Sequence, residues 1–336
     1  MVSLCEESKS YPTCLTLNGV VRESRPRAPA SFGEVWKATL GECPVCLKVA
    51  RVYINTDTEG FISAFAKDAI KWRQLVHPNI LPFYSVYLLE KQLGSGICLV
   101  SPWMVKGNVL DYPKLDPETS RAPLVIDMLE RLDYLHRLGI VHGNIKPTNV
   151  LIPSSGSACL AEFDLKGSWD NLPALRWQAP ELLGSETDES QVLEPPKKSD
   201  MYSIICVMYE ILTGRIPYHE VLRDAMVILE LMSGAQPSKP SSFDSSELTN
   251  ETWEVMEQCF KRDLEQRLSI NGVLEKLRDR WTNPLTLRRL IAWVRRQRQD
   301  DGGSQKTISV GEFDKAACGT VSSSRLPTAD VELLRD

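Results

Sequence analysis

Residues 31–49, Ser31-Phe32-Gly33-Glu34-Val35-Trp36-Lys37-Ala38-Thr39-Leu40-Gly41-Glu42-Cys43-Pro44-Val45-Cys46-Leu47-Lys48-Val49, carry the pattern that decides the fold class. Apolar side chains recur there with a period of two, which is typical of β-strands, and Gly41 and Pro44 interrupt the run. Lys48 lies between two apolar residues, Leu47 and Val49. Because neighbouring side chains on a strand point to opposite faces, Lys48 is predicted to face a cleft and not the apolar core.

The chain around this stretch divides into a strand-rich part and a helical part. Residues 59–75 are predicted to form a helix, and residues 80–89 and 96–104 two further strands. Beyond residue 105 helical spacing dominates, and four helices are predicted over residues 124–138, 199–213, 248–261 and 269–281. Gly139 and Gly214 are placed to end the first two of them. A small strand-rich lobe followed by a larger helical lobe is an α+β arrangement.

Composition indicates an ordinary globular protein. The 336 residues are 43% apolar and 25% charged, and the net charge is −5, so nothing favours a nucleic acid as partner. The N-terminus has no signal-peptide pattern, and the longest apolar stretch, residues 202–212, is about half of what a bilayer requires. Nine scattered cysteines fit a reducing compartment better than a disulfide framework. These observations together favour a cytoplasmic location.

Two features allow more than one interpretation. Cys43 and Cys46 form a CxxC pair, for which zinc binding and redox chemistry compete with the simpler reading of small strand residues. Residues 285–298 are predicted to be a basic amphipathic helix that packs on the helical lobe, lies on an anionic membrane or binds a partner. From residue 299 onward the composition is polar and rich in Ser and Gly, which predicts disorder.

Seven short segments resemble, in order and spacing, the landmarks of a protein kinase domain of the tyrosine-kinase-like type: Ser31–Lys37, Val45–Lys48, His77–Leu81, His142–Asn149, Ala179–Glu181, Lys198–Ser203, and Cys259–Asp263 with Arg267. The sequence of these segments is also similar to that of kinase-like domains of mushroom-forming fungi. The resemblance implies a bilobal fold, in which a small five-stranded β lobe with one helix, the family's αC, precedes a larger helical lobe. It covers residues 15–281, with the smaller lobe at 15–104 and the larger at 105–281. An extension of residues 1–14 and a tail of residues 282–336 remain outside it.

The resemblance assigns Lys48 to the α- and β-phosphates of ATP, and Asp68 to the position of the glutamate that holds this lysine. An aspartate reaches about 1.5 Å less far, one carbon–carbon bond. The pair is therefore predicted to be strained, water-bridged or open.

The glycine-rich loop resembles the family at Gly33 and Val35 but holds Ala28 and Ala30 where the family has its first two glycines. Each alanine adds a Cβ where phosphates would lie, and Pro29 lacks a donor N–H. Weak ATP binding is therefore predicted. A β-turn over residues 28–31 that binds no ligand is the alternative.

The catalytic loop departs from the family at the base. Asn144 stands where the family has an aspartate, and an amide cannot take up a proton at neutral pH. Losing such a base lowers the rate by roughly 10²–10⁴. Gly143 replaces the arginine that reads a phosphate on the activation segment, whereas Lys146 and Asn149 match the phosphate-binding and second-metal positions.

The metal motif is also altered, because Glu162-Phe163-Asp164 stands in place of Asp-Phe-Gly. Glu162 still offers an oxygen ligand for magnesium but is one methylene longer, so metal binding there is predicted to be weak. Asp164 could itself capture a metal, although an exposed carboxylate on a loop is commonplace.

The remaining carried-over residues shape the site. The resemblance implies that adenine contacts the following residues: Ser101, Trp103, Met104, Cys46 and Leu151. Four more residues match structural positions of the family: His142, Glu181, Asp200 and Arg267. Of these, Asp200 is predicted to cap its helix and to hold the catalytic-loop backbone, and Glu181 to pair with Arg267.

The residues that match the family are those that maintain its fold, whereas the residues that differ are those that carry its chemistry. This combination favours a pseudokinase that acts as a signalling scaffold or allosteric partner, with weak ATP and magnesium binding and a protein partner that the sequence does not name. Two alternatives stay open, a slow ATP-dependent Ser/Thr or Tyr kinase and a protein-interaction module that binds no nucleotide.

Overall fold

The computed structural model describes residues 16–30, 33–50, 72, 75, 80–89, 96–115, 119–161, 172–183, 196–241 and 247–281. Three predicted features lie outside these ranges: almost all of the helix at 59–75, the Glu162–Asp164 motif and the tail from residue 282.

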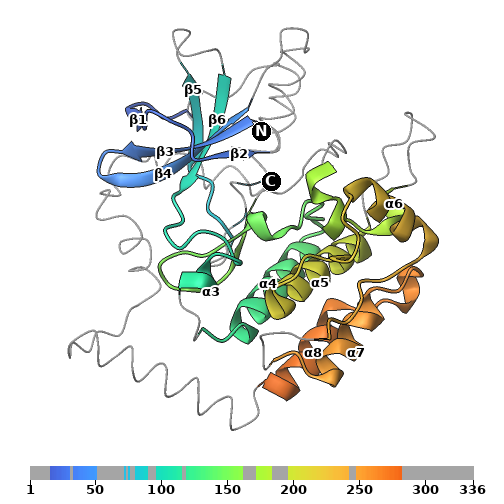
Figure 1. Ribbon diagram of the computed structural model, residues 1–336. Coiled ribbons are helices and arrows are strands. Elements are labelled where there is room, and N and C mark those ends of the chain that lie inside the picture. The colour runs from blue at the N-terminus through green and yellow to red at the C-terminus, as the bar shows by residue number, and fades with distance from the viewer. Residues whose placement is uncertain are drawn as a thin grey trace, which may run out of the picture.

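The first lobe is an antiparallel sheet of β1 (Val20–Arg22), β2 (Ala28–Ala30), β3 (Gly33–Leu40), β4 (Cys43–Ala50), β5 (Ser85–Leu89) and β6 (Gly96–Pro102). The order is β1-β3-β4-β6-β5, and β2 pairs with β3 beyond β1. β1 and β2 are thus two parts of one edge strand, and the sheet has the five strand positions that were predicted. Figure 1 shows this sheet above the helical lobe.

Alternation on β4 arises as the sequence indicated. Val45 and Leu47 are fully buried, in one core cluster with Trp36, Cys98 and Val100. The side chains of Cys46 and Lys48 are only partly covered and point to the opposite face. Lys48 therefore points away from the apolar core, as the alternation predicted.

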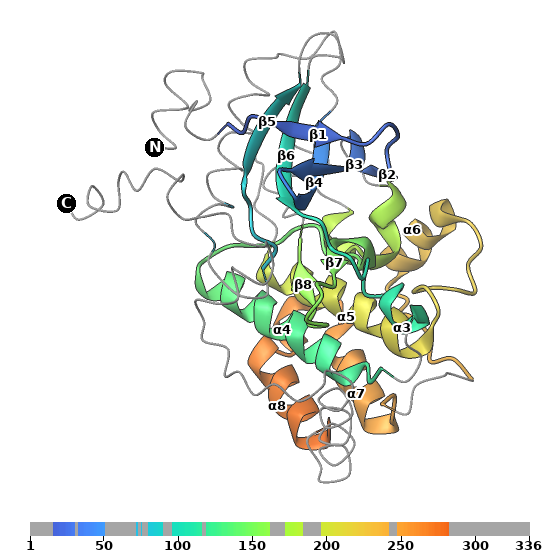
Figure 2. The same ribbon diagram turned by 90° about the vertical axis from the view of Figure 1, so that its left-hand side faces the viewer.

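The second lobe is helical, and its main elements are α3 (Tyr112–Leu115), α4 (Ala122–Arg137), α5 (Lys197–Thr213), α6 (Asp224–Ser233), α7 (Asn250–Cys259) and α8 (Ile270–Trp281). A small two-stranded sheet of β7 (Val150–Leu151) and β8 (Cys159–Leu160) lies against α4. Four 3₁₀ turns complete it: η3 (Pro147–Asn149), η4 (Leu172–Trp177), η5 (Pro180–Leu182) and η6 (Leu264–Gln266). Figures 1 and 2 show α4 and α5 side by side below the sheet, with α7 and α8 on the side remote from it. The fold is the predicted bilobal α+β arrangement.

α5 is the central helix of this lobe. Every residue from Ser199 to Thr213 is buried, so the apolar stretch at 202–212 belongs to a core helix, as predicted. The helix ends where Gly214 takes a φ of 69°, a left-handed conformation that glycine adopts without steric cost. Within the described ranges, no helix has both the length and the apolar character to cross a bilayer.

The cysteines differ from the expectation in one place. Cys43 takes part in a disulfide whose partner lies outside the described residues, so the expectation of reduced cysteines is wrong for Cys43. Cys46 is a free thiol, and so are Cys98, Cys159, Cys206 and Cys259. The two cysteines of the CxxC pair are therefore not bonded to each other. Within the described ranges, no cluster of three or more His, Cys, Asp or Glu side chains could hold a metal.

A buried ion pair joins η5 to the chain before α8. Arg267 is buried, and its Nη1 and Nη2 atoms donate to the two carboxylate oxygens of Glu181 at 2.7 Å each. Ser199 Oγ donates to the same carboxylate at 2.7 Å. Burial alone would raise the pKa of Glu181, but the hydrogen bonds from Arg267 and Ser199 outweigh it and lower the pKa. The predicted pair of Glu181 and Arg267 is confirmed.

We expect Glu181→Ala to destabilise the protein by about 3–5 kcal/mol, because it leaves the Arg267 guanidinium buried without its counter-charge. Urea unfolding followed by circular dichroism measures this change. The control is Arg27→Ala, which removes an exposed pair with Glu23 and should cost less than about 1 kcal/mol. Equal effects of the two variants would contradict the central role of the buried pair.

Candidate functional site

One carboxylate on α5 holds the loop that precedes η3. Asp200 is buried and accepts hydrogen bonds from the backbone N–H groups of His142, at 2.8 Å, and Gly143, at 2.9 Å. His136 Nε2 donates to the same carboxylate at 2.8 Å. The prediction that Asp200 holds this loop is confirmed. Its predicted capping role is wrong, because α5 begins after Pro196 without a side-chain cap.

The loop residues lock one another in turn. The N–H of Asn144 donates to His142 Nδ1 at 3.3 Å, and Asn149 Nδ2 donates to the Asn144 carbonyl at 2.8 Å. The N–H of Asn149 donates to the Lys146 carbonyl at 2.9 Å and so forms η3. Asn144 is thereby buried in a fixed position. With its nitrogen committed, Asn149 keeps its amide oxygen as the atom that can bind a cation.

Gly143 has a φ of 72°, in the left-handed region. A side chain at such a position costs about 1–2 kcal/mol. The glycine therefore does more than remove the family's arginine, since it also relieves backbone strain next to Asn144.

The sheet brings the predicted nucleotide residues to one face. Val35 is opposite Lys48, and Cys46 is opposite Ser101, in neighbouring pairs of the antiparallel ladder. Because side chains alternate along a strand, these four residues share one face of the sheet. Leu99 is opposite Lys48 on β6 and therefore belongs to the same face.

The sheet face and the loop meet through a shared apolar cluster. Leu99, Met104 and Leu151 pack against a buried cluster to which Ala161 belongs. The N–H of Ala161 donates to the Asn149 carbonyl at 2.9 Å. Met104 and Leu151, both of which the resemblance assigns to adenine, thus pack against the same cluster.

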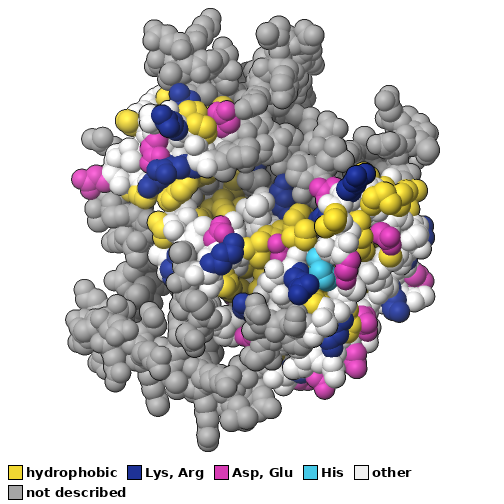
Figure 3. Space-filling view, viewed as in Figure 1, with side chains coloured by type: hydrophobic (Ala, Val, Ile, Leu, Met, Phe, Trp, Pro, Cys, Tyr) yellow, Lys and Arg dark blue, Asp and Glu magenta, His cyan; other side chains and the backbone are white. Residues whose placement is uncertain are grey.

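Trp103, another residue that the resemblance assigns to adenine, is held to β4. The N–H of Trp103 donates to the Pro44 carbonyl at 3.2 Å, and Lys37 Nζ lies 5.6 Å from the centre of a Trp103 ring. Ser101 is buried behind it. Figure 3 shows hydrophobic side chains gathered between the two lobes on the face of Figure 1.

Three predicted positions need separate mention. Asp68 and Glu162 lie outside the described residues. Ala28–Ala30 is the strand β2, paired with β3 as far as Ala30 opposite Gly33, so the alternative of a β-turn over residues 28–31 is wrong for these three residues. The side chains of Ala28, Ala30 and Gly33 are not among those that the structure describes.

Comparison with known proteins agrees with this geometry. The family model of the protein kinase domain matches residues 30–278. The chain belongs to the protein kinase domain family.

The chain is also similar to serine/threonine kinases of distant organisms. It is 24% identical to the serine/threonine-protein kinase STY46 of Arabidopsis thaliana, over 75% of this chain and 43% of that protein. It is 31% identical to the probable serine/threonine-protein kinase PknB of Bifidobacterium longum, over 52% of this chain and 27% of that protein. It is 24% identical to human receptor-interacting serine/threonine-protein kinase 1, over 64% of this chain and 34% of that protein. The chain thus spans less than half the length of these curated relatives.

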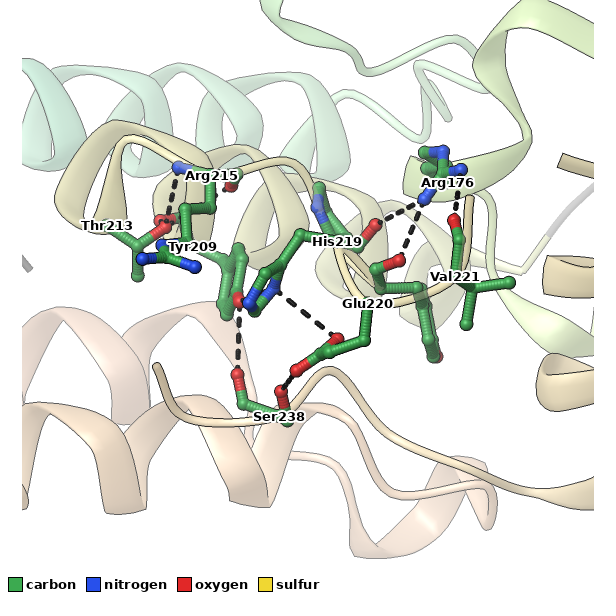
Figure 4. A network of polar contacts seen from close by, with 10 residues as sticks. Arg176, Tyr209, Thr213, Arg215, His219, Glu220, Val221 and Ser238 are labelled. Carbon is green, nitrogen blue, oxygen red and sulfur yellow. Dashed lines mark hydrogen bonds and ion pairs between the residues drawn. The ribbon is translucent and has the colours of Figure 1, made fainter. Parts of the chain in front are cut away.

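The kinase domain contains a segment before η5 that sequence reasoning did not assign. Arg176 is buried and donates from Nε to Asp224 Oδ1 at 2.7 Å, and from its Nη atoms to the carbonyls of Pro217, Tyr218 and Val221 at 2.7–3.2 Å. Figure 4 shows Arg176 directed at the loop that contains Val221. This arginine ties η4, and with it the end of the activation segment, to the start of α6.

Glu210 was also missed, although it stands out as the one charged residue between Tyr202 and Leu212. It is buried on α5 and accepts a hydrogen bond from Trp177 Nε1 at 2.9 Å. Burial raises the pKa of Glu210 to about 7, against the opposing effects of the Trp177 hydrogen bond and the charge of Lys114. The carboxyl group therefore titrates near neutral pH, directly beneath the activation segment.

We expect the melting temperature of the wild type to fall more between pH 5 and pH 8 than that of Glu210→Gln. Because the folded-state pKa is raised to about 7, Glu210 contributes most below its unfolded value near 4.5, and this contribution is lost as pH rises through 7. Glutamine keeps an oxygen that can accept from Trp177 and carries no charge. Differential scanning fluorimetry across this pH range measures the difference.

The matched control is Glu257→Gln, at an exposed carboxylate that accepts from Trp253 Nε1 at 2.6 Å. It should leave the pH profile of the wild type unchanged. Identical profiles for Glu210→Gln and the wild type would show that Glu210 does not titrate in this range.

Proposed function

We propose that this protein kinase domain is catalytically impaired, and that it acts as a signalling scaffold or allosteric partner with weak ATP binding. The observation that carries the proposal is Asn144. It occupies the base position in a loop that Asp200 and Asn149 hold in place, and an amide cannot take the proton of a substrate hydroxyl. The loop therefore keeps its shape without its base.

The phosphate end of the site supports the same conclusion. Ala28, Pro29 and Ala30 form a strand paired with β3, and the sequence there lacks two of the family's glycines and one backbone N–H, which weakens phosphate binding. Protein kinases use ATP with magnesium, and the described residues of the site supply one evident cation ligand, the amide oxygen of Asn149. A magnesium ion bound there would neutralise phosphate charge. With Glu162 as its other ligand, we expect both ATP and magnesium to bind weakly.

A slow but working kinase is the second candidate. Lys48, Cys46 and Ser101 share one face of the sheet, and phosphoryl transfer through a loose transition state needs little help from a base. The relatives of this chain are named serine/threonine-protein kinases, which favours a serine or threonine hydroxyl as the substrate. An interaction module that binds no nucleotide is the third candidate.

We expect ATP at about 10 mM to raise the melting temperature by about 3–5 °C if the dissociation constant is on the order of 1 mM, since a ligand of the folded state stabilises it by mass action. Lys48→Ala should abolish this shift. Lys114→Ala, at an exposed lysine of the helical lobe, is the control and should keep it. The thermal shift is measured with and without magnesium. No shift in the wild type would leave the interaction module as the function.

We expect Asn144→Asp to raise phosphoryl transfer by less than about tenfold, because the glycine-rich loop, the Lys48 partner and the metal motif are altered as well. A radiometric autophosphorylation assay with a generic protein substrate measures the rate, and Asn144→Ala is the matched control. A gain of roughly 10²–10⁴ would show that the rest of the site works and would establish the slow kinase instead.

A further inference from the structure

Helix α6 exposes a continuous apolar stripe. Leu222, Met226, Leu229 and Met232 have exposed fractions of 93%, 48%, 56% and 56%. Met226, Leu229 and Met232 are three residues apart, which puts them on one side of the helix, and Leu222 precedes the helix by two residues. Val227 and Leu231 are fully buried on the opposite side and hold α6 to the lobe. Figure 3 shows the hydrophobic side chains gathered where Figure 1 places α6.

The stripe is held on a rigid base. Arg176 fixes the loop before α6 and Asp224 at its first turn. Two further hydrogen bonds hold the same loop, as Figure 4 shows. Its His219 is hydrogen-bonded to Tyr209 of α5, and its Glu220 accepts from Ser238. A backbone held in this way is already ordered before a partner binds, which favours association.

Two opposite charges lie near the two ends of the stripe. Arg223 and Glu230 are both exposed; Arg223 is the residue just before α6, and Glu230 lies in the second half of the helix. Neither side chain makes an ion pair within the described part of the chain. The positive charge is at the start of α6 and the negative charge is near its end.

We propose that the α6 stripe binds the α6 stripe of a second copy of this chain, in an antiparallel pairing about a two-fold axis. Antiparallel alignment places Leu222 opposite Met232, and Met226 opposite Leu229. The same alignment brings Arg223 of one copy to Glu230 of the other, twice over. A two-fold interface requires a self-complementary surface, and this stripe is self-complementary in both apolar contact and charge.

The chain's own tail fits this surface less well. Arg280 pairs with Glu251 at the start of α7, whereas Arg262, beyond the end of α7, donates to the Met232 carbonyl of α6. The three residues 282–284 span about 10 Å at full extension, less than the length of α7, about 15 Å. The segment 285–298 also carries five arginines, and like charges would repel it from a surface that includes Arg223 and Arg262.

Sedimentation velocity of the full chain, over about 5 to 300 µM, tests the pairing. We expect a reversible dimer with a dissociation constant on the order of 10–100 µM, as befits a small interface. The double variant Leu222→Glu/Leu229→Glu should remain monomeric throughout, while Leu138→Glu, at an exposed leucine just beyond the end of α4, should dimerise like the wild type. A monomeric wild type at 300 µM would overturn the proposal and leave the stripe to another protein or a membrane.

Complementary charge variants test the antiparallel geometry. Arg223→Glu and Glu230→Arg each place like charges opposite one another at both contacts, and each should weaken the homodimer about tenfold or more. Mixed one to one, the two variants restore opposite charges at both contacts, so the mixture should dimerise like the wild type. Dimerisation of the mixture no stronger than that of either variant alone would overturn the antiparallel alignment.

Discussion

The catalytic loop depends on one buried carboxylate. Asp200 lies on α5, the most completely buried helix, and accepts two backbone N–H groups from a loop nearly sixty residues earlier in the chain. A carboxylate buried without partners would be costly, but these donors and His136 compensate for the lost hydration. The position of Asn144, and through it that of Asn149, follows from this arrangement. The loop can therefore keep its shape whether or not its residues retain the chemistry.

Local pattern predicted local structure, whereas the confirmed long-range contacts, those of Asp200 with the loop and of Glu181 with Arg267, were predicted from the resemblance to the family. The alternation around Lys48 and the end of α5 at Gly214 were both readable, because strand periodicity and glycine conformation act locally. The resemblance also assigned Asp200 a capping role, but its hydrogen-bond partners come from another part of the chain. A contact of that kind has no local signature.

The same reason explains the residues that were missed. Arg176 bonds to carbonyls some forty residues away, and Glu210 meets Trp177 across thirty-three positions. Glu210 did leave a signal, as a lone charge in an apolar helix, because a buried carboxylate requires a donor. Arg176 left none, since an arginine on a loop is ordinarily solvated. For Ala28–Ala30 the sequence showed the loss of glycine, but the pairing with β3 had to be observed.

The two departures in the catalytic loop fit its folded shape. With glycine at position 143 the chain adopts a φ of 72° without the steric cost that an arginine would carry there. With asparagine at position 144, a neutral amide replaces a carboxylate at a buried position, so no second charge has to be compensated close to Asp200. Both changes thus relieve costs that a catalytic loop bears for the sake of its chemistry. The absence of those costs from this loop supports the proposal that the domain acts as a scaffold.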